Sequence, residues 1–152
     1  MDESDMKLTK TPQVLLVEDS LADITLIKRI LRQRQIPNEL HVVNDGVEAM
    51  AFLRKEGKYQ NAPIPHIILL DLNLPKKNGK EVLKEIKSDP GLRLIPVIIL
   101  TTSDNDQDIR DCYKEYANAY LCKPNSLEGL SECMAAIENF WFRFVEYTIE
   151  CS

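Results

Sequence analysis

Acidic, hydroxyl and lysine side chains directly follow four short apolar runs of the 152-residue sequence. Glu18 and Asp19 follow the run 14–17, Asp71 follows 67–70, Thr101 follows 97–100, and Lys123 follows 119–122. Close carboxylates repel one another, and a hard cation such as Mg²⁺ relieves that repulsion because it prefers oxygen ligands. An aspartate in such a site can attack phosphorus, while a hydroxyl and an ammonium group stabilise the phosphoryl group in transit. These side chains therefore suit Mg²⁺-assisted phosphoryl transfer, provided that the fold brings them together.

Each of these side chains, taken alone, also has an ordinary structural explanation. Asp19 or Ser20 would serve as the N-cap of a following helix, and Asp104 as the N-cap of a later one. Thr101 fits a strand end, and Lys123 fits a solvated surface position. The functional interpretation therefore depends on whether the fold places these residues in one crevice.

The predicted order of strands and helices would place them there. The runs 14–17, 67–70 and 97–100 are continuously apolar, which is typical of parallel strands buried on both faces. Further strands are expected at 119–122 and, more weakly, at 40–43, with helices at 20–35, 46–55, 79–89, 104–116 and 126–149. This alternation predicts an α/β fold with a doubly wound, five-stranded parallel sheet. Ligands bind at the carboxyl ends of the strands in such sheets, where the side chains would meet.

Composition argues against several classes of function. The chain has 24 acidic against 19 basic residues, a net charge of -5, which disfavours nucleic-acid binding because phosphate contacts need clustered Lys and Arg. No run of about 18 apolar residues exists, so no membrane span is expected. The four cysteines, Cys112, Cys122, Cys133 and Cys151, lack the paired spacing of metal sites, and we interpret them as reduced thiols of a cytoplasmic protein. Residues 1–11 are expected to form a flexible tail.

Four motifs, in this order and spacing, give the sequence a resemblance to a known family. They are 15–20 (LLVEDS), 70–75 (LDLNLP) with Gly79, 96–101 (PVIILT) and 120–124 (YLCKP). With them, the sequence resembles the receiver domain of two-component response regulators over roughly residues 13–137. The resemblance implies a flavodoxin-like receiver fold with strand order 2-1-3-4-5. It also implies that residues 12–139 form the receiver domain.

Further segments resemble the single-domain regulators that partner cyanobacterial phytochromes. They are 61–63 (NAP), 71–79 (DLNLPKKNG), 100–103 (LTTS), 117–120 (ANAY) and Phe140-Trp141. This closer resemblance implies a sensor histidine kinase of the phytochrome type as the partner that phosphorylates the protein. Because the receiver uses nearly the whole chain, we expect no separate output domain and a downstream partner that is another protein.

The resemblance implies a role for each acidic residue. Asp71 accepts the phosphoryl group. Asp19, Asp71 and the backbone carbonyl of Asn73 bind Mg²⁺, for which Mn²⁺ can substitute, and Glu18 acts through a bound water.

It also implies roles for residues of the last two predicted strands. Thr101 hydrogen-bonds a phosphoryl oxygen and Lys123 pairs with it. Tyr120 occupies the position of an aromatic switch that rotates inward when Thr101 moves; an ordinary strand aromatic packed on the helix at 104–116 is the alternative. Pro124 fits the position of a cis peptide bond after the lysine.

The segment 140–152 extends the last predicted helix and is rich in aromatic residues. They are Phe140, Trp141, Phe142, Phe144 and Tyr147. We expect them to form the interface of a homodimer, because aromatics are enriched at interfaces and an exposed apolar patch marks association. The alternative is that they fold back onto their own domain. A membrane-bound helix is disfavoured because Arg143 is the only base after Phe140.

Three functions compete at this stage. The favoured one is a phosphorylation switch. Such a protein is not an enzyme, and it catalyses only its own phosphorylation and autodephosphorylation. The second is a phosphatase of the haloacid dehalogenase type, which needs a second acid where this chain has Asn73. The third is a flavin carrier, which needs a Gly-rich phosphate loop where Glu18 and Asp19 would repel phosphate.

Overall fold

The computed structural model describes residues 11–142, and their core is one five-stranded parallel sheet. The strands are β1 (Gln13–Val17), β2 (Glu39–Val43), β3 (Ile67–Leu70), β4 (Val97–Thr101) and β5 (Ala119–Cys122). Their order across the sheet is β2-β1-β3-β4-β5, and every neighbouring pair is parallel. The predicted doubly wound α/β fold and its strand order are confirmed.

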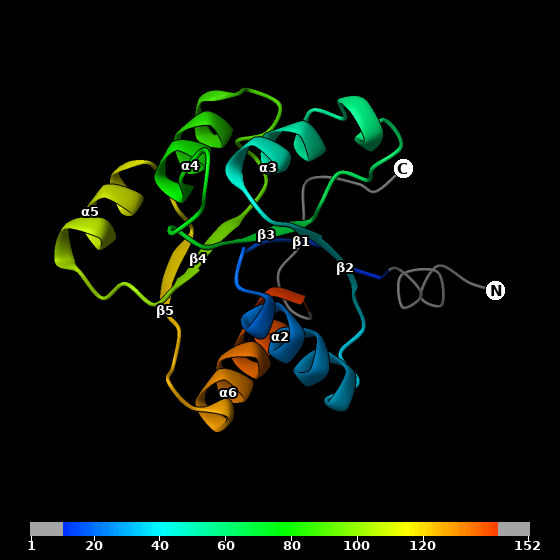
Figure 1. Ribbon diagram of the computed structural model, residues 1–152, viewed down its shortest axis with the longest axis vertical. Coiled ribbons are helices and arrows are strands. Elements are labelled where there is room, and N and C mark those ends of the chain that lie inside the picture. The colour runs from blue at the N-terminus through cyan, green and yellow to red at the C-terminus, as the bar shows by residue number, and fades with distance from the viewer. Residues whose placement is uncertain (1–10, 143–152) are drawn as a thin grey trace.

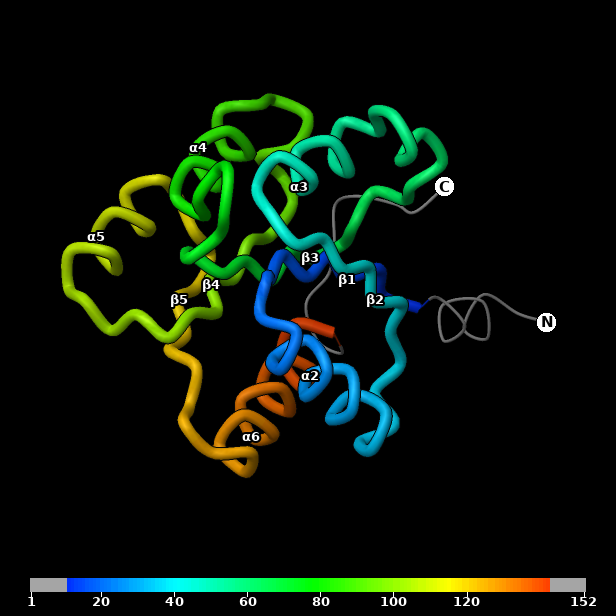
Figure 2. The backbone as a smooth tube through the Cα atoms, in the orientation of Figure 1, coloured from blue at the N-terminus to red at the C-terminus, as the bar shows by residue number. Residues whose placement is uncertain are grey.

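Within residues 11–142, five α-helices cover the sheet, and Figure 1 shows how they are divided between its two faces. They are α2 (Leu21–Gln33), α3 (Gly46–Leu53), α4 (Gly79–Ser88), α5 (Asp106–Lys114) and α6 (Leu127–Ile137). A short 3₁₀ turn, Gly57–Tyr59, follows α3. Helices α3, α4 and α5 lie on one face and α2 and α6 on the other, and the path between them can be followed in Figure 2. No helix within residues 11–142 is long and apolar enough to cross a membrane.

Two apolar clusters, one on each face, hold the layers together. Alternate strand residues point to opposite faces, so Leu15 and Ile68 belong to the cluster under α3, α4 and α5. Val14 and Ile67 belong to the cluster under α2 and α6. Burial on both faces explains why the central strands are continuously apolar.

The side chains that cap the helices differ in part from those expected. Ser20, not Asp19, caps α2, because its Oγ accepts a hydrogen bond from the backbone N–H of Asp23. Asn105, not Asp104, caps α5, which therefore begins at Asp106. Asp19 and Asp104 consequently have no capping role and remain exposed at the carboxyl edge of the sheet.

The α-helix predicted over 126–149 ends earlier than expected. Helix α6 stops at Ile137 and continues as a π-helical segment, Glu138–Phe142. Trp141 and Phe142 both pack against the cluster under α2 and α6. In a π-helical segment the backbone hydrogen bonds run from residue i to i+5, so the residues after Ile137 leave the 3.6-residue register of α6. Residues 143–149 lie outside the described residues.

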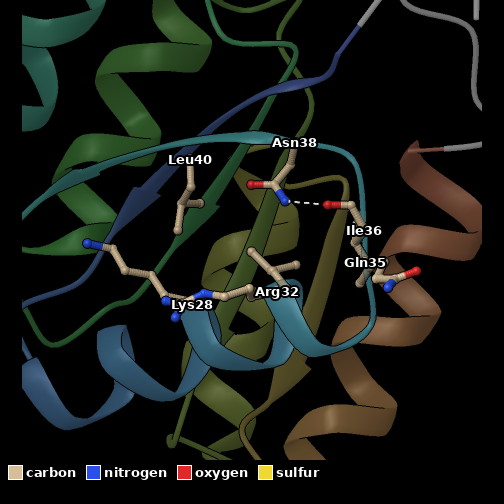
Figure 3. Close-up of a pocket in the computed structure, with 7 residues that line it drawn as sticks. Lys28, Arg32, Gln35, Ile36, Asn38 and Leu40 are labelled. Atoms are coloured by element: carbon tan, nitrogen blue, oxygen red, sulfur yellow. Dashed lines mark hydrogen bonds between the residues drawn. The ribbon is translucent and has the colours of Figure 1, made fainter. Parts of the chain in front are cut away.

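A hollow of about 380 Å³ lies between the last turns of α2 and the start of β2 (Figure 3). Lys28, Arg32 and Leu40 line it, and Asn38 closes its rim by donating a hydrogen bond to the carbonyl of Ile36 at 2.7 Å. Helix α2 begins at the carboxyl edge of the sheet and runs away from it, so this hollow is separate from the predicted site.

The close approach of α4 to the backbone after β3 gives a test of how the sheet edge is built. A Cβ added at Gly79 would lie 2.2 Å from the backbone oxygen of Asp71 and 2.6 Å from Cα of Leu72. Gly79→Ala should therefore lower the free energy of unfolding by about 1–3 kcal/mol, as overpacking does. Urea denaturation measures this change. Gly91→Ala is the matched control, since its Cβ would meet only a side-chain oxygen of Asp89 at 3.4 Å. Equal stability of the two variants would contradict the close packing.

Candidate functional site

Backbone hydrogen bonds continue beyond the strand ends and hold the candidate residues at one edge of the sheet. The N–H of Glu18 donates to the carbonyl of Val43 at 3.0 Å, and the N–H of Asp71 donates to Val17 at 3.0 Å. On the other side, the N–H of Lys123 donates to Thr101 at 2.6 Å. The ladder thus fixes the main chain of the residues that were predicted to share a crevice.

Three carboxyl groups meet at this edge. Glu18, Asp19 and Asp71 each offer one oxygen, and these oxygens lie within 4.8 Å of one another. Asp19 is exposed, whereas Glu18 is only 1% exposed and Asp71 is buried. The Oε2 atom of Glu18 has no hydrogen-bond partner within residues 11–142, so it is free to carry a proton or to bind a cation. The donor set therefore fits a hard divalent cation such as Mg²⁺.

The fourth predicted ligand, Asn73, is placed by its backbone. Its N–H points to the Oδ1 atom of Asp71 at 3.4 Å, which brings the main chain after β3 back to the carboxylate. The Asn73 side chain is exposed.

The ammonium group of Lys123 lies among three carboxylates. Its Nζ is 2.8 Å from Glu18 Oε1, 2.8 Å from Asp23 Oδ2 and 3.4 Å from Asp71 Oδ2. The side chain of Lys123 is buried, so it is no solvated surface lysine. Asp23 was not predicted as a site residue. The signal for it was its place three residues after the cap Ser20, which puts it in the first turn of α2 at the same edge.

Burial and mutual contact shift the pKa values of these groups in different directions. Burial and the contact with Asp71 raise the pKa of Glu18 to about 8, against the opposing effect of Lys123. Burial also acts to raise the pKa of Asp71, but the contacts with Glu18, Thr101 and Lys123 outweigh it and lower that pKa below its usual value. Burial opposes the charge of Lys123, yet Asp23 and Glu18 raise its pKa. Without a cation, the site therefore favours the ionised form of Asp71 and shifts Glu18 toward its protonated form.

Thr101 lies beside Asp71, and Tyr120 lies on the neighbouring strand β5. Thr101 is fully buried, and its hydroxyl has no hydrogen-bond partner within the described part of the chain. The hydroxyl of Tyr120, which is partly exposed, donates to the carbonyl of Ser103 at 2.9 Å. This bond ties β5 to the loop that follows β4.

The prediction of a cis peptide bond before Pro124 is wrong, because none is present within residues 11–142. A trans X–Pro bond is the intrinsically preferred form, by about 0.5–1 kcal/mol. The trans bond is compatible with the hydrogen bond from Lys123 to Thr101 and with the cap of α6 at Ser126.

The aromatic residues predicted to form a dimer interface differ in their surroundings. Phe140 is 57% exposed, and its ring meets that of Trp141 with centroids 5.4 Å apart. Trp141 and Phe142 are partly buried against their own domain. Phe144 and Tyr147 lie outside the described residues.

Comparison with known proteins identifies the family of this site. The model of the response regulator receiver domain family matches residues 14–135. The chain belongs to this family. The match spans β1 to α6 and so includes every strand end at which the site is built.

Similar receivers are known over almost the full length of the chain. Response regulator Rcp1 of Synechocystis sp. is 49% identical over 132 residues, which cover 87% of this chain and 90% of Rcp1. The structure of the phosphorylated cyanobacterial phytochrome response regulator RcpA is 48% identical, with a TM-score of 0.88 over 92% of this chain and 100% of RcpA. The Mn²⁺-bound structure of Rcp1 is 47% identical, with a TM-score of 0.86 over 91% of this chain and 99% of that one. The phosphatase alternative is not supported.

Because the pKa of Glu18 is raised in the cation-free receiver, divalent cations should bind more tightly as the pH rises. A bound cation favours the ionised form of Glu18, and the pKa of about 8 sets the upper end of the effect. The affinity for Mn²⁺ should increase by up to about tenfold per pH unit below pH 8 and then level off. Calorimetric titrations at pH 6, 7, 8 and 9 measure it. Asp19→Asn should weaken binding at every pH. A wild-type affinity that does not change between pH 6 and 8 would contradict the raised pKa of Glu18.

Proposed function

We propose that the protein is a cytoplasmic phosphorylation switch in which Asp71 accepts a phosphoryl group from the phosphohistidine of a sensor histidine kinase. Residues 12–139 form the receiver domain, and 140–152 form an extension of it. The observation that carries the proposal is the surroundings of Asp71: a buried carboxylate with a lowered pKa, beside Glu18 and Asp19 and 3.4 Å from Lys123. Such a carboxylate is ionised and ready to attack phosphorus.

The residues at the sheet edge have different roles in the phosphoryl transfer. A carboxylate oxygen of Asp71 forms the new bond to phosphorus while the bond from phosphorus to the histidine nitrogen of the kinase breaks. The negative charge of the phosphoryl oxygens develops next to the ammonium of Lys123 and the unpartnered hydroxyl of Thr101. Both are donors already in place, which is how a site stabilises charge without reorganising. The protein then acts only on itself, through this transfer and the later hydrolysis of its own phosphoaspartate.

Mg²⁺ is the cation that we assign to the acidic cluster, and Mn²⁺ can take its place. Asp19, Asp71 and the backbone carbonyl of Asn73 would hold it directly, and Glu18 would do so through water. When bound, the cation supplies positive charge for the phosphoryl oxygens. The oxygen donors within 4.8 Å of one another and the unpartnered Oε2 of Glu18 support this assignment. The Mn²⁺-bound form of Rcp1 is a related precedent.

A histidine kinase of the phytochrome type is the proposed phosphoryl donor. The support is the likeness to RcpA, a phytochrome response regulator, at 48% identity over 92% of this chain. The downstream partner is a protein of unknown identity.

Thr101 and Tyr120 are the proposed switch. Phosphorylation of Asp71 would draw Thr101 toward the phosphoryl group, and Tyr120 would turn inward into the space that it leaves. The hydrogen bond from Tyr120 to the carbonyl of Ser103 would have to break for this turn, so the loop after β4 would move with it. The change would reach the surface formed by α5, β5 and α6.

Asp71→Asn should abolish phosphorylation and leave the fold intact, because an amide is not a nucleophile toward phosphorus but has nearly the same shape. The measurement is transfer of labelled phosphate from acetyl phosphate and from a phosphorylated phytochrome kinase. Asp104→Asn is the matched control. It removes an exposed carboxylate near the same edge whose side chain has no hydrogen bond or ion pair within residues 11–142, and it should accept label like the wild type. Acid-labile label on Asp71→Asn would refute the assignment.

We further propose that the protein forms a homodimer through Phe140, Trp141, Phe142, Phe144 and Tyr147. Of the described members, Phe140 is the one most exposed, so it should contribute most to association. Phe140→Ser should shift a concentration-dependent dimer to monomer in light scattering, with a dissociation constant raised at least about tenfold, since burying an aromatic side chain contributes roughly 1.5–3 kcal/mol. Leu94→Ser is the control, because Leu94 is 58% exposed and lies in the α4–β4 loop. Full-length protein that stays monomeric at micromolar concentrations would contradict the dimer.

A further inference from the structure

Asp23 is a fourth carboxylate at the site, and the proposed transfer leaves it without a role. The Nζ atom of Lys123 lies 2.8 Å from Asp23 Oδ2 and 2.8 Å from Glu18 Oε1, but 3.4 Å from Asp71 Oδ2. A lysine ammonium has three N–H donors, so these three carboxylates occupy all of them. A phosphoryl group on Asp71 can take over the contact of Asp71 with Lys123, but it gains a second N–H of the ammonium group only if Glu18 or Asp23 gives one up.

Asp23 is the partner that Lys123 can release at the lowest cost. Glu18 is only 1% exposed, so losing Lys123 would leave its carboxyl group buried without a charged partner. The side chain of Asp23 is 30% exposed, and water can replace the lost contact. Asp23 also lies in the first turn of the 13-residue helix α2, where the helix dipole favours a negative charge. The Oγ atom of Ser20 fixes that turn, because it accepts a hydrogen bond from the backbone N–H of Asp23 at 3.3 Å.

We propose that Asp23 is a positioning residue that holds Lys123 on the α2 side of the crevice in the unphosphorylated protein and competes with the phosphoryl group for it. The inference rests on the proposed function, since it presupposes a phosphoryl group on Asp71. Asp23 then tunes how readily the site accepts that group, whereas Asp71 and Lys123 decide whether it does.

The first experiment tests the ion pair alone, in cation-free protein without any phosphoryl mimic. Nitrogen-15 NMR of the Lys123 ammonium group at one fixed pH measures how fast its protons exchange with water. Asp23→Asn should speed this exchange severalfold, because one of the three acceptors loses its charge. Asp23→Glu keeps the carboxylate and should remain closer to the wild type, and Asp104→Asn should not change the rate. Unaltered exchange in Asp23→Asn would overturn the proposal. Melting temperatures establish that all variants are folded.

The second experiment tests the competition, with beryllium fluoride as the phosphoryl mimic at saturating Mg²⁺. Calorimetry should find that Asp23→Asn binds the mimic about two- to fivefold more tightly than the wild type, the range expected for a partly exposed charge pair. Asp104→Asn should bind like the wild type. In a Lys123→Gln background, Asp23→Asn should have no further effect, because the competition acts through Lys123.

Three results of the second experiment would overturn the competition. They are weaker or unchanged binding in Asp23→Asn, equal tightening in Asp104→Asn, and tightening that persists in the Lys123→Gln background; the last two would indicate general charge repulsion. A wild-type protein that does not bind beryllium fluoride would contradict the proposed function itself, and the competition with it. The exchange measurement would still show in that case whether Asp23 holds Lys123.

Discussion

The ion pairs of Lys123 are the interactions on which the rest of the site depends. Its ammonium group is buried, and so are the carboxyl groups of Glu18 and Asp71 that it contacts. Buried charges are tolerated only when they are paired, and removing one partner of such a pair typically costs about 3–5 kcal/mol. One lysine therefore allows two acidic side chains to remain within the edge of an apolar sheet. The exposed Asp19 and the partly exposed Asp23 complete the cluster from the solvent side.

The parallel sheet is what lets residues as far apart as Glu18 and Lys123 form this pair. All five strands end at the same edge, and hydrogen bonds beyond the strand ends fix the main chain of the site residues there. The packing that forms the site is independent of the acidic residues themselves. Apolar clusters on both faces hold the sheet, and Gly79 lets α4 approach the backbone of Asp71 directly. Backbone hydrogen bonds and helix packing thus place the main chain of the acidic residues, and their side chains are left to respond to bound charge.

Most of the fold and the central site residues could be predicted from the sequence because they leave local signals. Continuous apolar runs mark the central strands, and the polar residues that follow them mark the site. Asp23 was missed because its local signal, an acid three residues after a cap, is equally typical of an ordinary helix start. The end of α6 was missed because the helical spacing of apolar residues continues from Ile137 to Trp141, so the sequence pattern gives no sign of the change to a π-helical segment. The peptide bond before Pro124 was inferred from family likeness, and no residue pattern supported that inference.

Charge balance links the states through which the site would pass. Four carboxylates and one ammonium leave three uncompensated negative charges, and protonation of Glu18, which its raised pKa favours, reduces them to two. A divalent cation that replaces this proton leaves one. Phosphorylation exchanges the single charge of Asp71 for up to two on the phosphoryl group, which restores a total near two. The buried part of the site therefore never accumulates much charge in a medium of low dielectric. The remaining negative charge falls on the carboxylates nearest to water, which are those of Asp19 and Asp23. Of these two, only Asp23 contacts Lys123 within the described residues. A regulator of this kind can therefore adjust its response at the exposed Asp23 while the buried pair of Glu18 and Asp71 stays unchanged.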